Sequence, residues 1–209
     1  LISAPAGSGK TTLAADLAHH ASEANVCWLS LDNGDSNLQT FLPTIAIALL
    51  ADSQPDLIEI FATGQIEARQ AANILINWLD QSAHTPLILI LDDLHLLTDP
   101  DIHAFLDYLI ERLPNHVHIV ATTRYDPTLS LARLRARAEL AELRLSEMRF
   151  SQQEAADYLN RLLGLDLPDQ LVDQLYRRTE GWIAGLRLLA LSLAHIDAAQ
   201  RAQYIDELA

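Results

Sequence analysis

Hydrophobic and polar positions follow two different patterns along this chain. Up to about residue 145, short apolar runs of strand length alternate with longer segments of helical composition. The strongest run covers residues 86–91 and is continuously apolar, which is typical of parallel strands covered on both faces. The other predicted strands cover residues 1–3, 25–31, 115–122 and 138–145.

Helices are predicted between these strands, at residues 13–21, 38–52, 66–82 and 101–113. Regular alternation of strand and helix favours a parallel α/β sheet flanked by helices. From residue 151 onward the pattern predicts helices only, at 151–164, 168–178, 182–195 and 198–208. Ser151 and Glu154 form a capping-box pattern, and Pro168 is placed to begin a helix. We therefore expect an α/β domain at residues 1–147 and a small helical subdomain at residues 148–209.

Composition narrows the possible partners. The 209 residues include 28 acidic and 14 basic side chains, a formal charge of −14, whereas nucleic-acid binding depends on basic residues. Direct nucleic-acid binding by this segment is not expected, and no apolar run reaches the roughly 18 residues of a membrane span. A single cysteine excludes an internal disulfide and favours a cytoplasmic setting. Because the chain begins with Leu, directly at a motif, we expect it to be part of a longer protein.

That motif is SAPAGSGKTT, residues 3–12, which lies between a predicted strand and a predicted helix. This is the context of a phosphate-binding loop, in which successive backbone N–H groups form a concave anion site at a helix N-terminus. Lys10 can reach the β- and γ-phosphates, and the Thr11 hydroxyl can bind Mg²⁺. Ala4 stands where the general pattern has Gly, and the alternative is a glycine-rich turn beside a surface lysine. The predicted nucleotide contacts are Ala6, Gly7, Ser8, Gly9, Lys10, Thr11 and Thr12.

Two acidic residues follow the strongest strand, in LILILDDLHLL at residues 87–97. We predict that Asp92 binds Mg²⁺ together with Thr11, and that Asp93 orients or deprotonates the attacking water. The alternative is a pair of solvated carboxylates at a strand end.

Arg124 follows another predicted strand, in IVATTRYDP. The carboxyl ends of parallel strands share one edge of the sheet, so Arg124 is expected to face the γ-phosphate together with Lys10 and Asp93. The alternative is a surface ion pair between Arg124 and Asp126.

Other polar and aromatic residues have less specific interpretations. Asp32 can join a water or Mg²⁺ network, but capping of the following turn is favoured. Trp182 is expected to pack in the helical region, with contact to the nucleotide as the alternative. The histidines, His95 among them, show no metal-ligand spacing and are interpreted as surface or strand positions. Cys27 is expected to be an unreactive core thiol.

Taken in order, several stretches resemble the nucleotide-binding module of STAND-type signalling NTPases, in particular the MalT-like branch of ATP-dependent LuxR-family transcriptional activators. They are SAPAGSGKTTL, WLSLDNGD, LILILDDLHLL, IVATTRYDP and TEGWIAGLRLLALSL. The resemblance covers nearly the whole chain. In this branch Ala at the position of Ala4 is usual, whereas many relatives have Pro where this chain has Ile183.

The resemblance implies a P-loop sheet of the ASCE type, with the strand before Thr122 between the phosphate-loop strand and the Asp92 strand. It also implies a helical, lid-like subdomain over the nucleotide. ADP would hold an inactive monomer, ATP with an unknown inducer would favour self-association, and slow hydrolysis would reset the switch. Arg124 would match the sensor arginine, and DNA binding would belong to a further C-terminal domain.

Two other functions are compatible with a phosphate loop. A P-loop kinase of a small metabolite would phosphorylate an acceptor faster than it hydrolyses ATP. A mechanical NTPase would show a basic channel or a transporter motif, and the −14 charge argues against the channel. A switch would instead retain ADP tightly through purification.

Overall fold

Strands and helices alternate up to residue 144 in the computed structural model, which describes residues 1–50, 54–64, 66–81 and 85–207. The chain divides into two compact units. The first comprises Leu1–Ser3 and Lys10–Leu143. The second comprises Arg144–Ala209 and, notably, the loop Ala4–Gly9.

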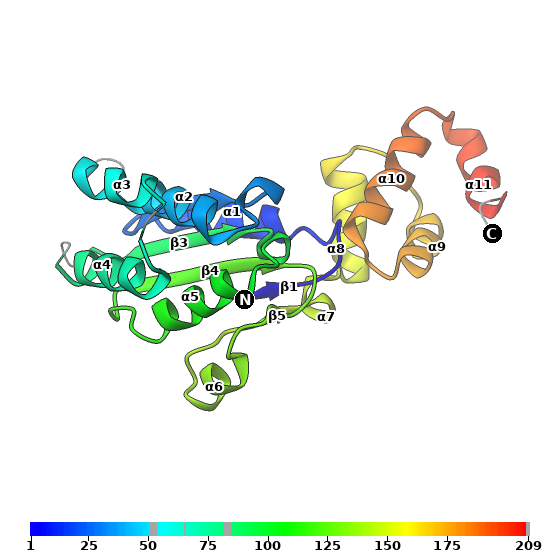
Figure 1. Cartoon of the computed structure of the whole chain (residues 1–209). Coiled ribbons are helices and arrows are strands. Elements are labelled where there is room, and N and C mark those ends of the chain that lie inside the picture. Colours follow the sequence, from blue (N-terminus) through cyan, green and yellow to red (C-terminus); the bar gives the residue numbers. More distant parts are fainter. Residues whose placement is uncertain (51–53, 65, 82–84, 208–209) are drawn as a thin grey trace. The chain divides into compact units, whose positions relative to one another are not determined.

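The first unit is built on a sheet with the strand order β2-β3-β4-β1-β5 (Figure 1). Its strands are β1 (Ile2–Ser3), β2 (Asn25–Ser30), β3 (Leu87–Asp92), β4 (Val117–Thr123) and β5 (Leu143–Arg144). The pairs β2/β3, β3/β4 and β1/β4 are parallel. The predicted parallel α/β sheet is therefore confirmed, including the position of β4 between β1 and β3.

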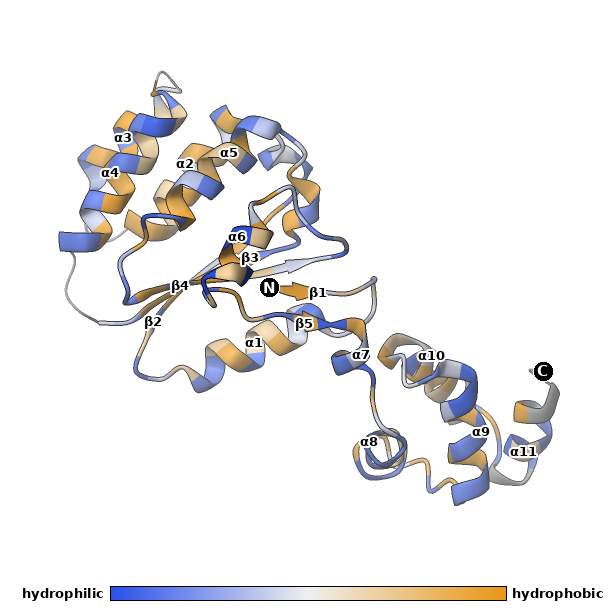
Figure 2. Cartoon of the chain, turned by 90° about the horizontal axis from the view of Figure 1, so that it is seen from below, coloured by the Kyte–Doolittle hydropathy of each residue, from blue (hydrophilic) through white to orange (hydrophobic). Residues whose placement is uncertain are grey.

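Helices cover both faces of this sheet, with α1 on one side and α2, α4 and α5 on the other (Figure 2). The helices are α1 (Lys10–His20), α2 (Leu38–Leu50), α3 (Pro55–Ala62), α4 (Ala68–Gln81), α5 (Pro100–Ile110) and α6 (Leu131–Ala136). Two 3-10 turns, η1 (Asn33–Asp35) and η2 (Leu94–Leu96), follow β2 and β3.

The main hydrophobic core lies between the strands and α2, α4 and α5. Leu89 and Leu91 of β3 pack there with Phe41 of α2 and Phe105 of α5. Ile90 is also fully buried, at the alternate position that faces the other side of the sheet. Burial on both faces explains the continuous apolar run of β3.

Several predicted elements differ in extent. The strand expected at 138–145 is only Leu143–Arg144. Helix α3 was not predicted, although Pro55 is well placed at its first turn, and α6 was also missed. The expected helix ends at residues 52, 82 and 208 lie outside the described residues.

The second unit is helical, as predicted. Its elements are α7 (Leu145–Met148), α8 (Gln152–Ala156), the π-helix η3 (Asp157–Leu162), α9 (Asp169–Thr179), α10 (Ile183–Ala194) and α11 (Ala198–Glu207). The single helix expected at 151–164 changes to π geometry because the Leu163 N–H bonds to the Tyr158 carbonyl, five residues earlier. Leu159, Leu175, Leu186 and Ile205 form part of a separate core. Among the described residues, no helix is long and apolar enough to span a bilayer.

Candidate nucleotide site

Asp92 and Thr122 mark the ends of two neighbouring parallel strands. The last paired residues of β3 and β4 are Leu91 and Ala121, so Asp92 and Thr122 follow at the same level. The Thr122 hydroxyl donates to Asp92 Oδ1 at 2.5 Å, and the Thr11 hydroxyl donates to the same oxygen at 3.1 Å. This network fixes the Asp92 carboxylate, which is buried.

The donor set around Asp92 fits a magnesium ion. Mg²⁺ prefers oxygen ligands and is commonly held by one or two protein oxygens together with phosphate and water. A threonine hydroxyl and a carboxylate oxygen 3.1 Å apart supply two such oxygens. The structure thus brings Thr11 and Asp92 together, as their predicted metal role requires.

Asp93 adopts a left-handed backbone conformation, with φ 62° and ψ 41°. Its N–H donates to Thr122 Oγ1 at 2.9 Å, so one threonine hydroxyl contacts both acidic residues. The Asp93 carboxylate is partly exposed and lies 3.7 Å from His95 Nδ1. Left-handed non-glycine residues are strained and concentrate at functional sites.

Lys10 is buried at the start of α1. Burial lowers the pKa of its ammonium group, the nearby Asp93 and Asp92 carboxylates oppose this shift, and Arg124 adds to it. The charges of Asp93, Arg124 and Asp92 therefore all act on the Lys10 ammonium group. Lys10 is also the only lysine in the sequence.

Arg124 follows β4 and is exposed. Within the part of the chain that the structure describes, it makes no ion pair, and the alternative pairing with Asp126 is not formed. Asp126 instead lies 3.7 Å from Arg135. The guanidinium group of Arg124 remains close enough to Lys10 and His95 to lower the pKa of each.

The phosphate loop has the backbone geometry of an anion site. Gly7 and Gly9 have φ values of 74° and 83°, which only glycine adopts without strain. Among the described residues, the N–H groups of Gly7, Ser8 and Gly9 have no hydrogen-bond acceptor, and the buried Ser8 Oγ has no partner. Unsatisfied donors in a glycine loop are what a bound phosphate requires. Thr12 lies exposed in the first turn of the following helix.

The start of α10 holds this loop within the second unit. Trp182 Nε1 donates to the Ala6 carbonyl at 3.2 Å, and the Ala184 N–H donates to the Gly7 carbonyl at 3.1 Å. A Cβ atom on Gly7 would lie only 2.5 Å from Ala184 Cβ. Both hydrogen bonds use loop carbonyls, so they leave the loop N–H groups available. Trp182 thus contacts the phosphate loop itself, which the packing interpretation did not anticipate.

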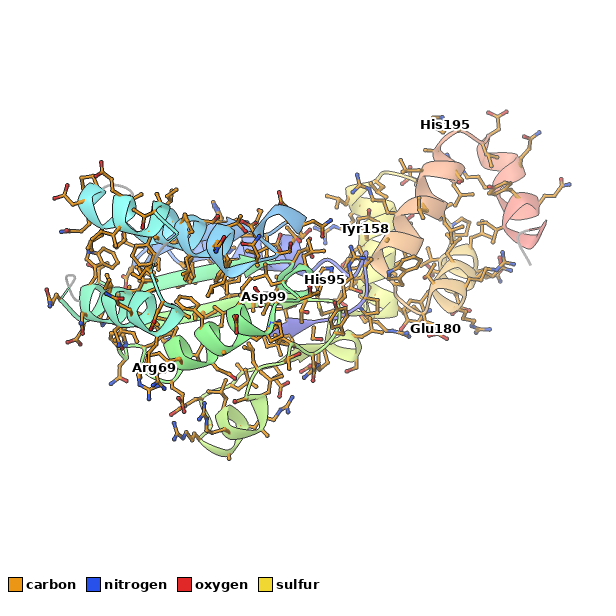
Figure 3. All side chains as sticks on the ribbon, in the orientation of Figure 1. Arg69, His95, Asp99, Tyr158, Glu180 and His195 are labelled. Atoms are coloured by element: carbon orange, nitrogen blue, oxygen red, sulfur yellow. The ribbon has the colours of Figure 1, made fainter. Side chains whose placement is uncertain are left out.

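His95 was wrongly interpreted as a surface or strand position. It is buried in η2, at the carboxyl end of β3 (Figure 3), and neither ring nitrogen has a hydrogen-bond partner among the described residues. Burial lowers the pKa of its imidazole, although the adjacent Asp93 carboxylate opposes this effect. Its position two residues after the acidic pair was the feature of the sequence that could have indicated a place in the site.

Thr122 was also missed as a site residue. A hydroxyl near the end of a strand, two residues before Arg124, was the feature of the sequence that could have indicated this role. Asp32 caps η1 as favoured, since its carboxylate accepts the Gly34 N–H at 2.5 Å. Cys27 is partly buried, and burial raises its thiol pKa, so its thiolate form is disfavoured.

A pocket of about 510 Å³ lies elsewhere, in the second unit. Its two arginines are already paired, Arg149 with Glu180 at 2.6 Å and Arg177 with Asp173 at 2.8 Å. Because their charges are compensated, this pocket lacks the positive character of a phosphate site.

The sheet order, the glycine loop and the acidic strand end define a P-loop nucleotide-binding domain. The chain belongs to the AAA ATPase domain family, whose profile matches residues 1–122. It is 35% identical over 92% of its length to the serine/threonine-protein kinase PknK of Mycobacterium tuberculosis. It is 31% identical over 92% of its length to the HTH-type transcriptional regulator MalT of Serratia proteamaculans.

The chain spans about a fifth of the length of these relatives, 18% of PknK and 21% of MalT. Among solved structures, it is similar to Drosophila ORC bound to DNA, with a TM-score of 0.58 and 14% identity over 100% of this chain and 55% of that one. It is also similar to Aeropyrum pernix ORC1 in complex with DNA, with a TM-score of 0.54 and 18% identity over 92% and 53% of the two chains. These similarities show the fold.

Proposed function

We propose that this chain is an ATP/ADP-operated signalling switch with slow ATPase activity. It would be the STAND-type nucleotide module of a larger, MalT-like regulator of the LuxR family. The observation that carries the proposal is the contact between the phosphate loop and the start of α10. Because Ala6 and Gly7 are hydrogen-bonded to Trp182 and Ala184, a phosphate bound by the loop would act directly on the helical unit.

The relatives support a switch over an enzyme with its own acceptor substrate. The same segment is similar to parts of a protein kinase and of a transcriptional regulator. A function shared by both would be nucleotide-dependent control of whatever domain accompanies the module. The −14 charge is consistent with this division, because DNA contacts would belong to another domain.

In this proposal Lys10 neutralises the β- and γ-phosphates, and Gly7, Ser8 and Gly9 donate N–H groups to them, with Ala6 and Thr12 flanking the same loop. Thr11 and Asp92 hold Mg²⁺, which would supply charge stabilisation at the phosphates. Asp93 orients the attacking water, and Arg124 contacts the γ-phosphate. ATP and ADP differ only at that phosphate. If the switch is to work, the contacts of these groups with the γ-phosphate must therefore differ between the two conformations of the protein.

The helical region, 148–209, would act as the lid of the α/β domain, 1–147. ADP would favour an inactive monomer, and ATP with an inducer would favour self-association in the cytoplasm. The acidic surface would limit self-association until a specific interface forms, since like charges repel.

Trp182 emission offers a direct test. In a Trp28→Phe/Trp78→Phe background, Trp182 is the only tryptophan. We expect its emission to differ between ADP and a non-hydrolysable ATP analogue, because the indole bonds to the loop that binds the phosphates. Calorimetry under the same conditions would establish that both nucleotides are bound. Tight binding of both with identical emission would contradict the switch.

A further inference from the structure

Beyond the end of their backbone pairing, β3 and β4 are connected through side chains. The last register pair is Leu91 with Ala121. Beyond it, the Tyr125 hydroxyl donates to the His95 carbonyl at 2.8 Å. The two rings also meet edge to face, with centroids 5.8 Å apart and an interplanar angle of 78°. Tyr125 therefore joins the segment after β4 to the turn after β3.

Tyr125 is held at its backbone as well. The hydroxyl of the buried Thr123 donates to the Tyr125 carbonyl at 2.6 Å. Arg124 lies between these two residues, so its backbone is fixed on both sides while its side chain is exposed. A fixed backbone reduces the conformational entropy that an exposed arginine loses when it contacts a ligand.

The contact between Tyr125 and His95 also lies next to Asp93. His95 is buried, and its Nδ1 lies 3.7 Å from the Asp93 carboxylate. The Tyr125 hydroxyl bonds to the backbone of the same short turn, η2, that begins directly after Asp93. One side chain thus links the backbones that carry Arg124 and Asp93.

Burial does not explain the position of Tyr125. The residue is 57% exposed, so it adds little to the hydrophobic core, and its hydroxyl could bond to water instead. The orientation follows from the bond to His95 and the ring contact.

We infer that Tyr125 is a positioning residue that sets Arg124 and Asp93 relative to each other for hydrolysis and for discrimination between ATP and ADP. The inference rests on the proposed function, because it takes Arg124 as the group that contacts the γ-phosphate.

Tyr125→Phe removes the hydroxyl and keeps the ring. One net hydrogen bond corresponds to roughly a five-fold change in a rate or equilibrium constant. We expect kcat to fall about five-fold. We also expect the ratio of ATP-analogue to ADP affinity to fall by a similar factor, with KM for ATP rising accordingly while ADP affinity stays unchanged. Tyr108→Phe is the matched control, because its hydroxyl bonds to Asn73 in the same unit, away from the strand ends. It should change neither quantity, and both variants should have similar thermal midpoints.

A double-mutant cycle tests whether Tyr125 acts through Arg124. In an Arg124→Ala background, Tyr125→Phe should cause no further loss of affinity ratio. An equal loss in both backgrounds would overturn the inference, and so would a wild-type-like kcat and ratio in Tyr125→Phe. If the wild type binds nucleotide without measurable turnover, the ratio of ATP-analogue to ADP affinity alone tests the inference. A wild type that binds neither nucleotide would overturn the proposed function and the inference with it.

Discussion

The Thr122 hydroxyl lies 2.5 Å from Asp92 Oδ1 and also accepts the Asp93 N–H at 2.9 Å. Both distances lie within the normal hydrogen-bond range. A single buried hydroxyl therefore fixes the position of the Asp92 carboxylate, which is predicted to hold Mg²⁺. It also fixes the backbone of Asp93, which is predicted to orient water. We therefore predict that Thr122 supports the function of both acidic residues.

Replacing Thr122 with Val keeps the shape and removes both bonds. Because the part-buried Asp93 N–H and the buried Asp92 carboxylate lose a partner, we expect the free energy of unfolding to fall by about 1–3 kcal/mol. The Mg²⁺ dependence of ATP affinity should also weaken, as titrations with and without Mg²⁺ would show. Thr44→Val is the control: its hydroxyl bonds to Asp35, and ATP affinity should keep its Mg²⁺ dependence. An unchanged Mg²⁺ dependence in Thr122→Val would argue against this role.

Lys10→Ala should abolish measurable nucleotide binding. Loss of one charged hydrogen-bond donor alone weakens binding by about 1.5–3 kcal/mol, and the phosphates would also lose their neutralising charge. Calorimetry with ADP and ATP measures this directly. Arg187→Ala removes one positive charge at an exposed position of α10 and should leave affinity intact. ATP affinity unchanged in Lys10→Ala would refute the site assignment.

Asp93→Asn should leave nucleotide affinity intact and slow hydrolysis. The amide keeps the size of the side chain but is a far weaker base and carries no charge, and general-base catalysis typically contributes 10²–10⁴-fold. Single-turnover measurements with saturating ATP would separate chemistry from binding. Normal turnover would remove Asp93 from its proposed role, whereas weakened binding of both nucleotides would assign it a binding function.

Gly181→Ala should destabilise the second unit much more than Gly164→Ala. Both glycines have positive φ, at 75° and 65°, so alanine is strained at both positions by about 1–2 kcal/mol. At Gly181 the new Cβ would also lie 2.2 Å from the Phe150 carbonyl oxygen, whereas at Gly164 nothing lies within 4 Å. Thermal melts should show a clearly larger loss for Gly181→Ala. Equal losses would mean that the Gly181–Phe150 contact is easily relieved.

Unfolding free energy should depend on pH through His95. Its pKa in the folded chain is lower than the ordinary 6.5 because it is buried. Between these two values the unfolded chain binds more protons, so stability rises with pH through this window and falls as the pH drops below about 6.5. His95→Gln should reduce the slope by up to about 1.4 kcal/mol per pH unit. His118→Gln, at an exposed position of β4, is the control. Denaturant melts from pH 5 to 8 give the slope of unfolding free energy against pH. Identical slopes for the wild type and His95→Gln would contradict this role of His95.

Local patterns were enough to predict much of this structure. The apolar run before Asp92, the glycines of the phosphate loop and the capping box at Ser151 each depend on residues close together in the chain. Strand and helix periodicity, turn chemistry and motif spacing encode such features directly. The α/β sheet, the helical C-terminal region and the positions of Lys10, Thr11, Asp92 and Arg124 near one sheet edge follow from them.

Tertiary structure alone decided which distant residues meet. Ala6 and Trp182 are 176 positions apart. Thr122 meets Asp92, and Tyr125 meets His95, only because β3 and β4 are neighbours. No local periodicity specifies such pairs, because they depend on how complete elements pack. The sequence by itself therefore determined the elements and the nucleotide motifs. Packing determined that the phosphate loop bonds to α10 and that one threonine connects the two acidic residues.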